Sequence, residues 1–186
     1  MFVDTDKPRR IRDLYNQTSD IYDNRYRKIQ FTKFSEALNE ASPEGLILDA
    51  GCGTGLFLEF MEKTYHGFIV GIDLSLNMLR IAREKTEVAM LVAGDIEFMP
   101  FRNNVFDTLY SFSVLQNLSC DWCGVKEFFR VSRKKSKMII TALSKKYSFY
   151  DLDRLVRKAC LEKGIPCKWD ALFLSMEDIG VCVING

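Results

Sequence analysis

The stretch ILDAGCGTGLFLEF, residues 47–60, constrains this chain more than any other segment. A short apolar run reaches an acid, Asp49, and is followed at once by Gly51, Gly53 and Gly55. Glycine has no Cβ, so it permits positive φ and lets a ligand approach the backbone closely. The apolar run is typical of a buried parallel strand. The segment therefore predicts a strand–turn–helix unit with a ligand at its turn, although a tight turn without a ligand would need the same glycines.

The rest of the chain alternates between strand-like and helix-like segments. Strands are expected at 46–50, 68–73, 88–95, 105–114 and 137–143, and helices at 9–41, 55–65, 75–86, 120–132 and 149–163. Two final runs, 168–175 and 180–185, are expected to pair antiparallel. This alternation favours an α/β, Rossmann-like, doubly wound sheet of seven strands, mostly parallel with an antiparallel C-terminal hairpin and helices on both faces. We expect residues 1–186 to form a single domain, with 1–42 as a helical cap and 46–186 as the sheet core.

Two further acids stand at the ends of the next two expected strands. In open α/β sheets, ligands bind outside the carboxyl ends of the strands. Asp73 is placed to accept hydrogen bonds from the two hydroxyls of a ribose, and Asp95 from an exocyclic amine. The backbone N–H of Ile96 could donate to a ring nitrogen. Together with Asp49, these acids predict a pocket for a nucleoside that lacks phosphates and carries positive charge.

Other nucleotides fit the glycine turn less well. A phosphate-binding P-loop would need a G-x-x-x-x-G-K-[ST] sequence, which does not occur. A dinucleotide-binding G-x-G-x-x-G motif that starts at Gly51 would need a third glycine at position 56, which is Leu56. Asp49, so close before the turn, would repel a pyrophosphate. An NAD-type oxidoreductase is therefore disfavoured.

The segments LILDAGCGTG, GIDLSLNML, GDIEFMPF and FDTLYSFSVLQNL follow one another in this order. With them the chain resembles the class I S-adenosylmethionine-dependent methyltransferases, especially the small members that act on lipids, quinones and other small molecules. The resemblance implies S-adenosylmethionine as the cofactor, S-adenosylhomocysteine as the product, and methyl transfer to an O, N or C nucleophile of a small-molecule acceptor. RNA or protein acceptors stay open, as does a cofactor-binding scaffold or partner subunit without turnover of its own.

The resemblance also implies site residues. Carried over by position, the cofactor contacts are Tyr15, Tyr22, Arg27, Asp49, Ala50, Gly51, Cys52, Gly53, Gly55, Asp73, Leu74, Asp95, Ile96 and Ser111. The first three lie in a segment expected to close over the cofactor, and an aromatic stripe that packs on the sheet is the alternative for them. Gln116 and Asn117 are candidates for orienting the acceptor, with a loop or helix-capping role as the alternative. No catalytic base stands out.

Composition and charge limit the remaining possibilities. The net charge of +1 gives no long-range attraction to a polyanion. Neither a membrane span nor a secretory signal is recognised, so we expect a cytoplasmic monomer or homodimer. Cys120 and Cys123 form a C-x-x-C pair, which we expect to be ordinary thiols, and no metal site is expected. The basic run 130–137 is expected to be a solvated turn, with contact to RNA or an acidic partner as the alternative.

Overall fold

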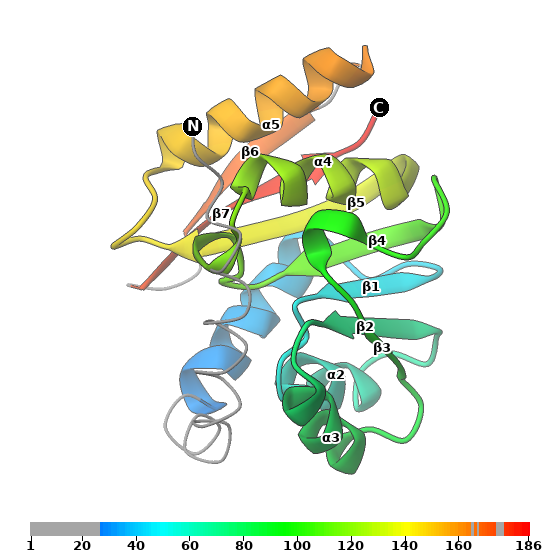
Figure 1. Cartoon of the computed structure of the whole chain (residues 1–186). Coiled ribbons are helices and arrows are strands. Elements are labelled where there is room, and N and C mark those ends of the chain that lie inside the picture. Colours follow the sequence, from blue (N-terminus) through cyan, green and yellow to red (C-terminus); the bar gives the residue numbers. More distant parts are fainter. Residues whose placement is uncertain (1–26, 165, 167, 174–176) are drawn as a thin grey trace.

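A computed structural model describes residues 27–164, 166, 168–173 and 177–186. Its centre is a seven-stranded sheet with the order β3-β2-β1-β4-β5-β7-β6 (Figure 1). The strands are β1 (Ile47–Ala50), β2 (Ile69–Asp73), β3 (Met90–Ala93), β4 (Phe106–Ser111), β5 (Ser132–Leu143), β6 (Lys168–Phe173) and β7 (Asp178–Ile184). Strands β1 to β5 pair in parallel, whereas β7 is antiparallel to both β5 and β6. The expected fold class and the antiparallel C-terminal hairpin are confirmed.

Helices cover both faces of the sheet. The described helices are a segment at 27–40, α2 (Leu56–Glu62), α3 (Leu76–Lys85), α4 (Asp121–Val131) and α5 (Phe149–Lys163), with short 3-10 turns η1 (Ile96–Phe98) and η2 (Leu115–Asn117). Local signals set their ends: the Ser75 side chain accepts a hydrogen bond from the N–H of Met78 and begins α3, and Gly164, with φ 64°, ends α5. None of the helices in these ranges is both long and apolar enough to cross a bilayer.

Strand β1 supplies both hydrophobic cores, one on each face of the sheet. Leu48 packs with Phe128 of α4 in the core beneath α4 and α5. Ile47 packs with Phe34 of segment 27–40 and Phe57 of α2 in the core on the opposite face. Side chains alternate along a strand, so a strand covered on both sides must be apolar at successive positions. This burial explains the unbroken apolar run that precedes the glycine turn.

Two expectations from the sequence are wrong. The basic run is not a turn between two elements, because Arg130 ends α4 and residues 132–137 open β5. This start of β5 is irregular: only Ser132 and Lys137 pair with β4, and residues 133–135 are exposed. Arg133 pairs with Asp107 at 2.7 Å and Lys137 with Glu44 at 2.7 Å. The second correction concerns Cys120 and Cys123, which form a disulfide across the first turn of α4. That turn places their Cα atoms 5.2 Å apart, within the range a disulfide needs.

Candidate functional site

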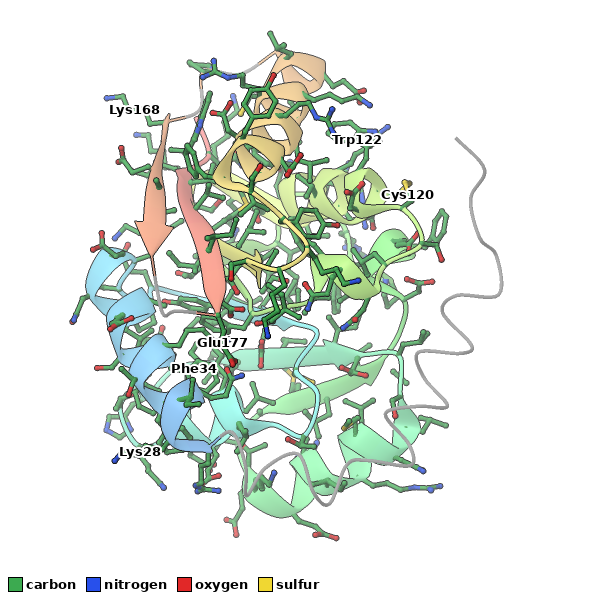
Figure 2. The ribbon with its side chains drawn as sticks, turned by 90° about the vertical axis from the view of Figure 1, so that its left-hand side faces the viewer. Lys28, Phe34, Cys120, Trp122, Lys168 and Glu177 are labelled. Atoms are coloured by element: carbon green, nitrogen blue, oxygen red, sulfur yellow. A yellow bond between two sulfur atoms is a disulfide. The ribbon has the colours of Figure 1, made fainter. Side chains whose placement is uncertain are left out.

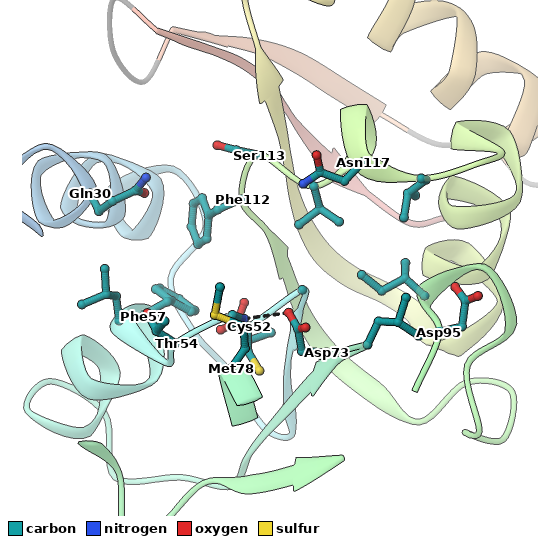
Figure 3. A pocket seen from close by; sticks show the side chains of 18 of the residues that line it. Gln30, Cys52, Thr54, Phe57, Asp73, Met78, Asp95, Phe112, Ser113 and Asn117 are labelled. Carbon is teal, nitrogen blue, oxygen red and sulfur yellow. Dashed lines mark hydrogen bonds between the residues drawn. The ribbon is translucent and has the colours of Figure 1, made fainter. Parts of the chain in front are cut away.

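A cavity opens at the carboxyl ends of β1, β2 and β4 (Figure 3). Nine residues predicted from the sequence line it: Asp49, Gly51, Cys52, Gly53, Asp73, Leu74, Asp95, Ile96 and Asn117. These residues belong to separate strand ends and turns, which the parallel sheet brings to one edge. The placement agrees with the position predicted for a ligand, while the role of each side chain stays a prediction.

The glycine turn has the backbone conformation that its sequence indicates. Gly51, Gly53 and Gly55 have φ values of 88°, 52° and 77°. A Cβ on Gly51 would collide with the side chain of Val114, so packing within the protein explains that glycine. A Cβ on Gly53 would meet no atom within 4 Å, although Gly53 lines the cavity. The space at Gly53 is therefore left open on the side from which a ligand approaches.

Asp73 both stabilises the glycine turn through hydrogen bonds and lines the cavity. Its Oδ2 accepts a hydrogen bond from the N–H of Gly53 at 2.9 Å (dashed in Figure 3), and its Oδ1 from the N–H of Ser75 at 2.8 Å. Burial raises the pKa of the Asp73 carboxyl, and these backbone donors oppose part of that rise. Each carboxylate oxygen has two lone pairs, so both retain the capacity to accept from a ribose hydroxyl.

Asp49 is the most unusual group in the cavity. Its side chain is 2% exposed, and its Oδ2 has no hydrogen-bond partner within the described ranges. Burial, and then the charge of Asp73, raise the pKa of the Asp49 carboxyl well above its usual value. An unpaired buried carboxylate is costly unless a cation or a donor reaches it. The ammonium and sulfonium groups of S-adenosylmethionine would supply positive charge here, so the residues present fit that cofactor.

The 3-10 turn η1 forms the end of the cavity where Asp95 lies (Figure 3). The Asp95 Oδ1 accepts from the N–H of Glu97 at 2.8 Å and begins this turn. Ile96 is buried, and Leu74 lies on the same cavity wall at 37% exposed. Apolar surfaces with a carboxylate and a backbone N–H beside them would suit an adenine ring. The Glu97 side chain, which sequence reasoning missed, also lines this end.

Phe112 and Ser113 line the cavity away from Asp95 (Figure 3), and a buried charged network lies behind them. The Lys33 Nζ donates to Ser113 Oγ at 3.0 Å and to Asp178 Oδ2 at 2.5 Å. Ser113 Oγ donates to the same Asp178 oxygen at 2.6 Å. Burial lowers the pKa of the Lys33 ammonium, and Asp178 opposes part of that shift. Ser113 has φ 55°, a conformation that a residue with a Cβ rarely adopts.

Several predicted residues lie away from the cavity lining. Ala50, Gly55, Ser111, Arg27 and Gln116 are not among the residues that surround it. The Gln116 amide donates to the carbonyl of Ser113 and accepts from the N–H of Leu143 at 3.5 Å, so it ties η2 to β5. The Arg27 guanidinium pairs with Glu59 of α2. Tyr15 and Tyr22 lie outside the described residues.

The fold and the cavity define an α/β protein that presents three acids from successive strand ends to one site. Comparison with known proteins shows that residues 48–140 match the methyltransferase domain family. With half of its residues matched, the chain belongs to that family, whose cofactor is S-adenosylmethionine. This confirms the resemblance indicated by the four sequence segments.

Individual relatives agree with this assignment. The chain is 34% identical over 103 residues to malonyl-[acyl-carrier protein] O-methyltransferase of Erwinia pyrifoliae, covering 53% of this chain and 37% of that one. It is 26% identical over 136 residues to the ubiquinone/menaquinone biosynthesis C-methyltransferase UbiE of Wigglesworthia glossinidia brevipalpis, covering 63% and 54%. A methyltransferase from Aquifex aeolicus superposes with a TM-score of 0.78 at 18% identity, covering 92% and 98%. The chain thus spans between 37% and 54% of these two curated relatives.

The raised pKa of Asp49 predicts that binding of S-adenosylmethionine releases a proton. The positive charge of the cofactor favours the ionised carboxylate, so the pKa of Asp49 falls on binding. Affinity should therefore rise with pH between the lowered pKa of Asp49 in the complex and its raised pKa in the free protein. Calorimetry at one pH within that window, in two buffers of different ionisation enthalpy, measures the released proton. Asp49→Asn should abolish the release, and equal apparent enthalpies for the wild type in the two buffers would contradict the prediction.

Proposed function

We propose that this protein transfers a methyl group from S-adenosylmethionine to an O, N or C nucleophile of a small-molecule acceptor. The observation that carries the proposal is the buried, unpaired carboxylate of Asp49, which shares one cavity with Asp73 and the open space at Gly53. The bound cofactor supplies a methyl group on a reactive sulfonium. The chain's own residues then have to hold and align the two reactants, which can contribute roughly 7 to 11 kcal/mol to catalysis.

The acceptor end of the cavity favours a molecule with an apolar part. Phe112 lies with its ring centroid 4.8 Å from that of Phe34 and 4.9 Å from that of Phe57, and all three line the cavity. Ser113 and Asn117 add polar atoms to this aromatic wall. The two curated relatives methylate a malonyl group on a carrier protein and act in quinone biosynthesis. We therefore favour a carboxylic acid or hydroxylated ring attached to a larger apolar group.

The test combines binding with turnover. Calorimetry with S-adenosylmethionine and S-adenosylhomocysteine should give dissociation constants in the micromolar range. Radiolabelled methyl groups are then followed into a malonyl thioester, a hydroxylated aromatic ring, bulk RNA and an acidic carrier protein. Label in a small molecule supports the proposal, and label in RNA or protein instead supports those acceptors. Binding without turnover on any acceptor would support a scaffold, and absence of binding would overturn the proposal.

Three further expectations belong to this proposal. We propose that residues 1–186 act as one methyltransferase domain, because strands from Ile47 to Ile184 share one sheet. A cytoplasmic location and a monomeric or homodimeric state stay predictions. Cell fractionation and light scattering of the purified protein test them.

Ser113→Gly is expected to slow methyl transfer about tenfold, or about 1.4 kcal/mol in the barrier, with little change in cofactor affinity. The substitution removes the hydroxyl that joins the Lys33–Asp178 pair to the cavity wall. Glycine accepts φ 55° without strain, so the fold should be retained. Initial rates on the acceptor identified above measure the effect. Asn104→Gly, at φ 56° before β4, is the matched control and should keep the wild-type rate; equal rates for both variants would contradict a role for the Ser113 hydroxyl.

A further inference from the structure

The disulfide between Cys120 and Cys123 closes the first turn of α4, at a place that reagents can reach. Cys120 is the N-cap residue, and its Sγ accepts from the N–H of Cys123 at 3.1 Å. Both cysteines are half-buried. Figure 2 shows Cys120 and Trp122 on the outer side of the molecule, at the start of α4. The bond is therefore accessible to a small thiol, and it forms no part of either hydrophobic core.

Glu97 links this disulfide directly to the cofactor cavity. Its carboxylate accepts hydrogen bonds from the N–H of Ser119 at 2.6 Å and of Cys120 at 3.2 Å. Glu97 is 6% exposed and lines the cavity at the end formed by η1. A carboxylate oxygen of Glu97 and the two sulfur atoms all lie within 4.8 Å of one another. Opening or closing the Cys120–Cys123 disulfide therefore affects Glu97, a residue of the cavity wall, by direct contact.

Gly124, the residue after Cys123, provides a second link. A Cβ at this position would collide with Leu118 and would lie 3.6 Å from the Cγ2 of Ile96. The backbone of α4 thus packs closely against two apolar residues that line the cavity. Met99, just after η1, also donates its N–H to Glu127 of α4 at 2.7 Å. The first turns of α4 and the η1 end of the cavity form one packed unit.

The position of the pair favours reversible thiol chemistry. A helix N-terminus stabilises a thiolate, and C-x-x-C pairs at such positions exchange readily with other thiols. In reduction by glutathione, the Cys120–Cys123 bond breaks and each sulfur gains one electron and one proton. Two glutathione molecules supply them, and their sulfur atoms join in glutathione disulfide. Atoms and charge balance with no further reagent.

We propose that Cys120 and Cys123 form a reversible redox site that sets the affinity of the cavity for its cofactor, with the disulfide form binding more tightly. The closed turn holds the N–H groups of Ser119 and Cys120 on Glu97. Reduction removes this constraint and leaves two protonated thiols, so the turn can move away from the Glu97 carboxylate. The displaced turn then disturbs Leu118 and Ile96. The inference rests on the proposed function, because it assumes that the nucleoside binds at this end.

The experiment uses the full chain and S-adenosylhomocysteine as the probe. The dissociation constant is measured by calorimetry after oxidation with glutathione disulfide and after reduction with a phosphine, with thiols counted in both states. Reduction should weaken binding about fivefold or more, the lower end of ordinary coupling between sites. Cys120→Ser/Cys123→Ser should bind like the reduced wild type in both conditions. Serine is a good N-cap residue, so α4 should still begin at the same place.

A matched control separates this pair from the free cysteines. Cys182→Ser changes a half-buried thiol of β7 and should respond to reduction as the wild type does. Linkage adds a second measurement, because a fivefold difference in affinity must shift the midpoint potential of the pair by about 20 mV when the probe is bound. Equal affinities in the two redox states would overturn the inference and leave the proposed function intact. Absence of binding in both states would overturn the proposed function.

Discussion

Asp73→Asn is expected to weaken binding of S-adenosylhomocysteine about 100-fold. Both oxygens of Asp73 accept backbone N–H groups, from Gly53 and Ser75. An asparagine can offer only one acceptor, so its amide nitrogen must face one of these donors. The variant also loses the charged acceptor for the ribose hydroxyls. A hydrogen bond to a charged group contributes about 1.5 to 3 kcal/mol, and about 2.8 kcal/mol corresponds to a hundredfold change.

Calorimetry measures this effect, and thermal unfolding shows whether the variant is folded. Asp107→Asn is the matched control, because Asp107 also accepts a backbone N–H, from Leu46 at 2.9 Å. Asp107 lies at the amino end of β4, away from the cavity, where it pairs with Arg133. It is not among the residues that line the cavity. Its replacement should leave affinity within about twofold of the wild type. A folded Asp73→Asn variant with near wild-type affinity would show that the nucleoside binds elsewhere.

Gly51→Ala is expected to lower the free energy of unfolding by about 3 kcal/mol. Positive φ costs a residue with a Cβ about 1 to 2 kcal/mol, and Gly51 has φ 88°. The new methyl group would also collide with Val114, and overpacking of this kind costs about 1 to 3 kcal/mol. The N–H groups of Gly51 and Cys52 both donate to the carbonyl of Ile72, so the backbone has little room to shift.

Gly53→Ala is the matched comparison in the same turn. Its φ of 52° carries a similar conformational cost, but its Cβ would meet no protein atom. We expect a loss of only about 1 to 2 kcal/mol in stability, together with a clear loss of cofactor affinity. Val114→Ala in the Gly51→Ala background should recover the steric part of the destabilisation. Denaturant unfolding measures the stabilities of Gly51→Ala, Gly53→Ala and the Gly51→Ala/Val114→Ala double variant. Equal stabilities for the Gly51 and Gly53 variants would contradict the assigned role of Val114.

The part of the cavity lining at the strand ends could be predicted because its signals are local. Asp49, Asp73 and the glycines lie next to apolar runs, and a parallel sheet brings all its strand ends to one edge. The wall formed by Phe112 and Ser113 could not be predicted in this way. Gln116 was a candidate for orienting the acceptor, and its amide ties η2 to β5. The position after β4 that faces the cavity is taken by Ser113, because the chain turns there with positive φ.

The errors share a physical cause. The charges of the basic run predict exposure, and residues 133–135 are exposed, but β5 already begins at Ser132 because Ser132 pairs with Phe106 of β4. We expected free thiols at Cys120 and Cys123 because disulfides are rare in cytoplasmic proteins. The geometry of one helical turn nevertheless places the two sulfur atoms in bonding range. Local residue type decides neither outcome.

The sequence by itself determined the alternation of strands and helices, the positive-φ turn at the glycines, and the acids at three strand ends. These properties depend on backbone conformation and on neighbours a few residues away. Only the tertiary structure decided that Lys33 meets Asp178 across 145 positions of sequence behind Ser113, and that α4 packs its disulfide-closed turn on the cavity wall. Such contacts depend on how distant elements pack, because a buried charge is stable only where the fold brings it a partner.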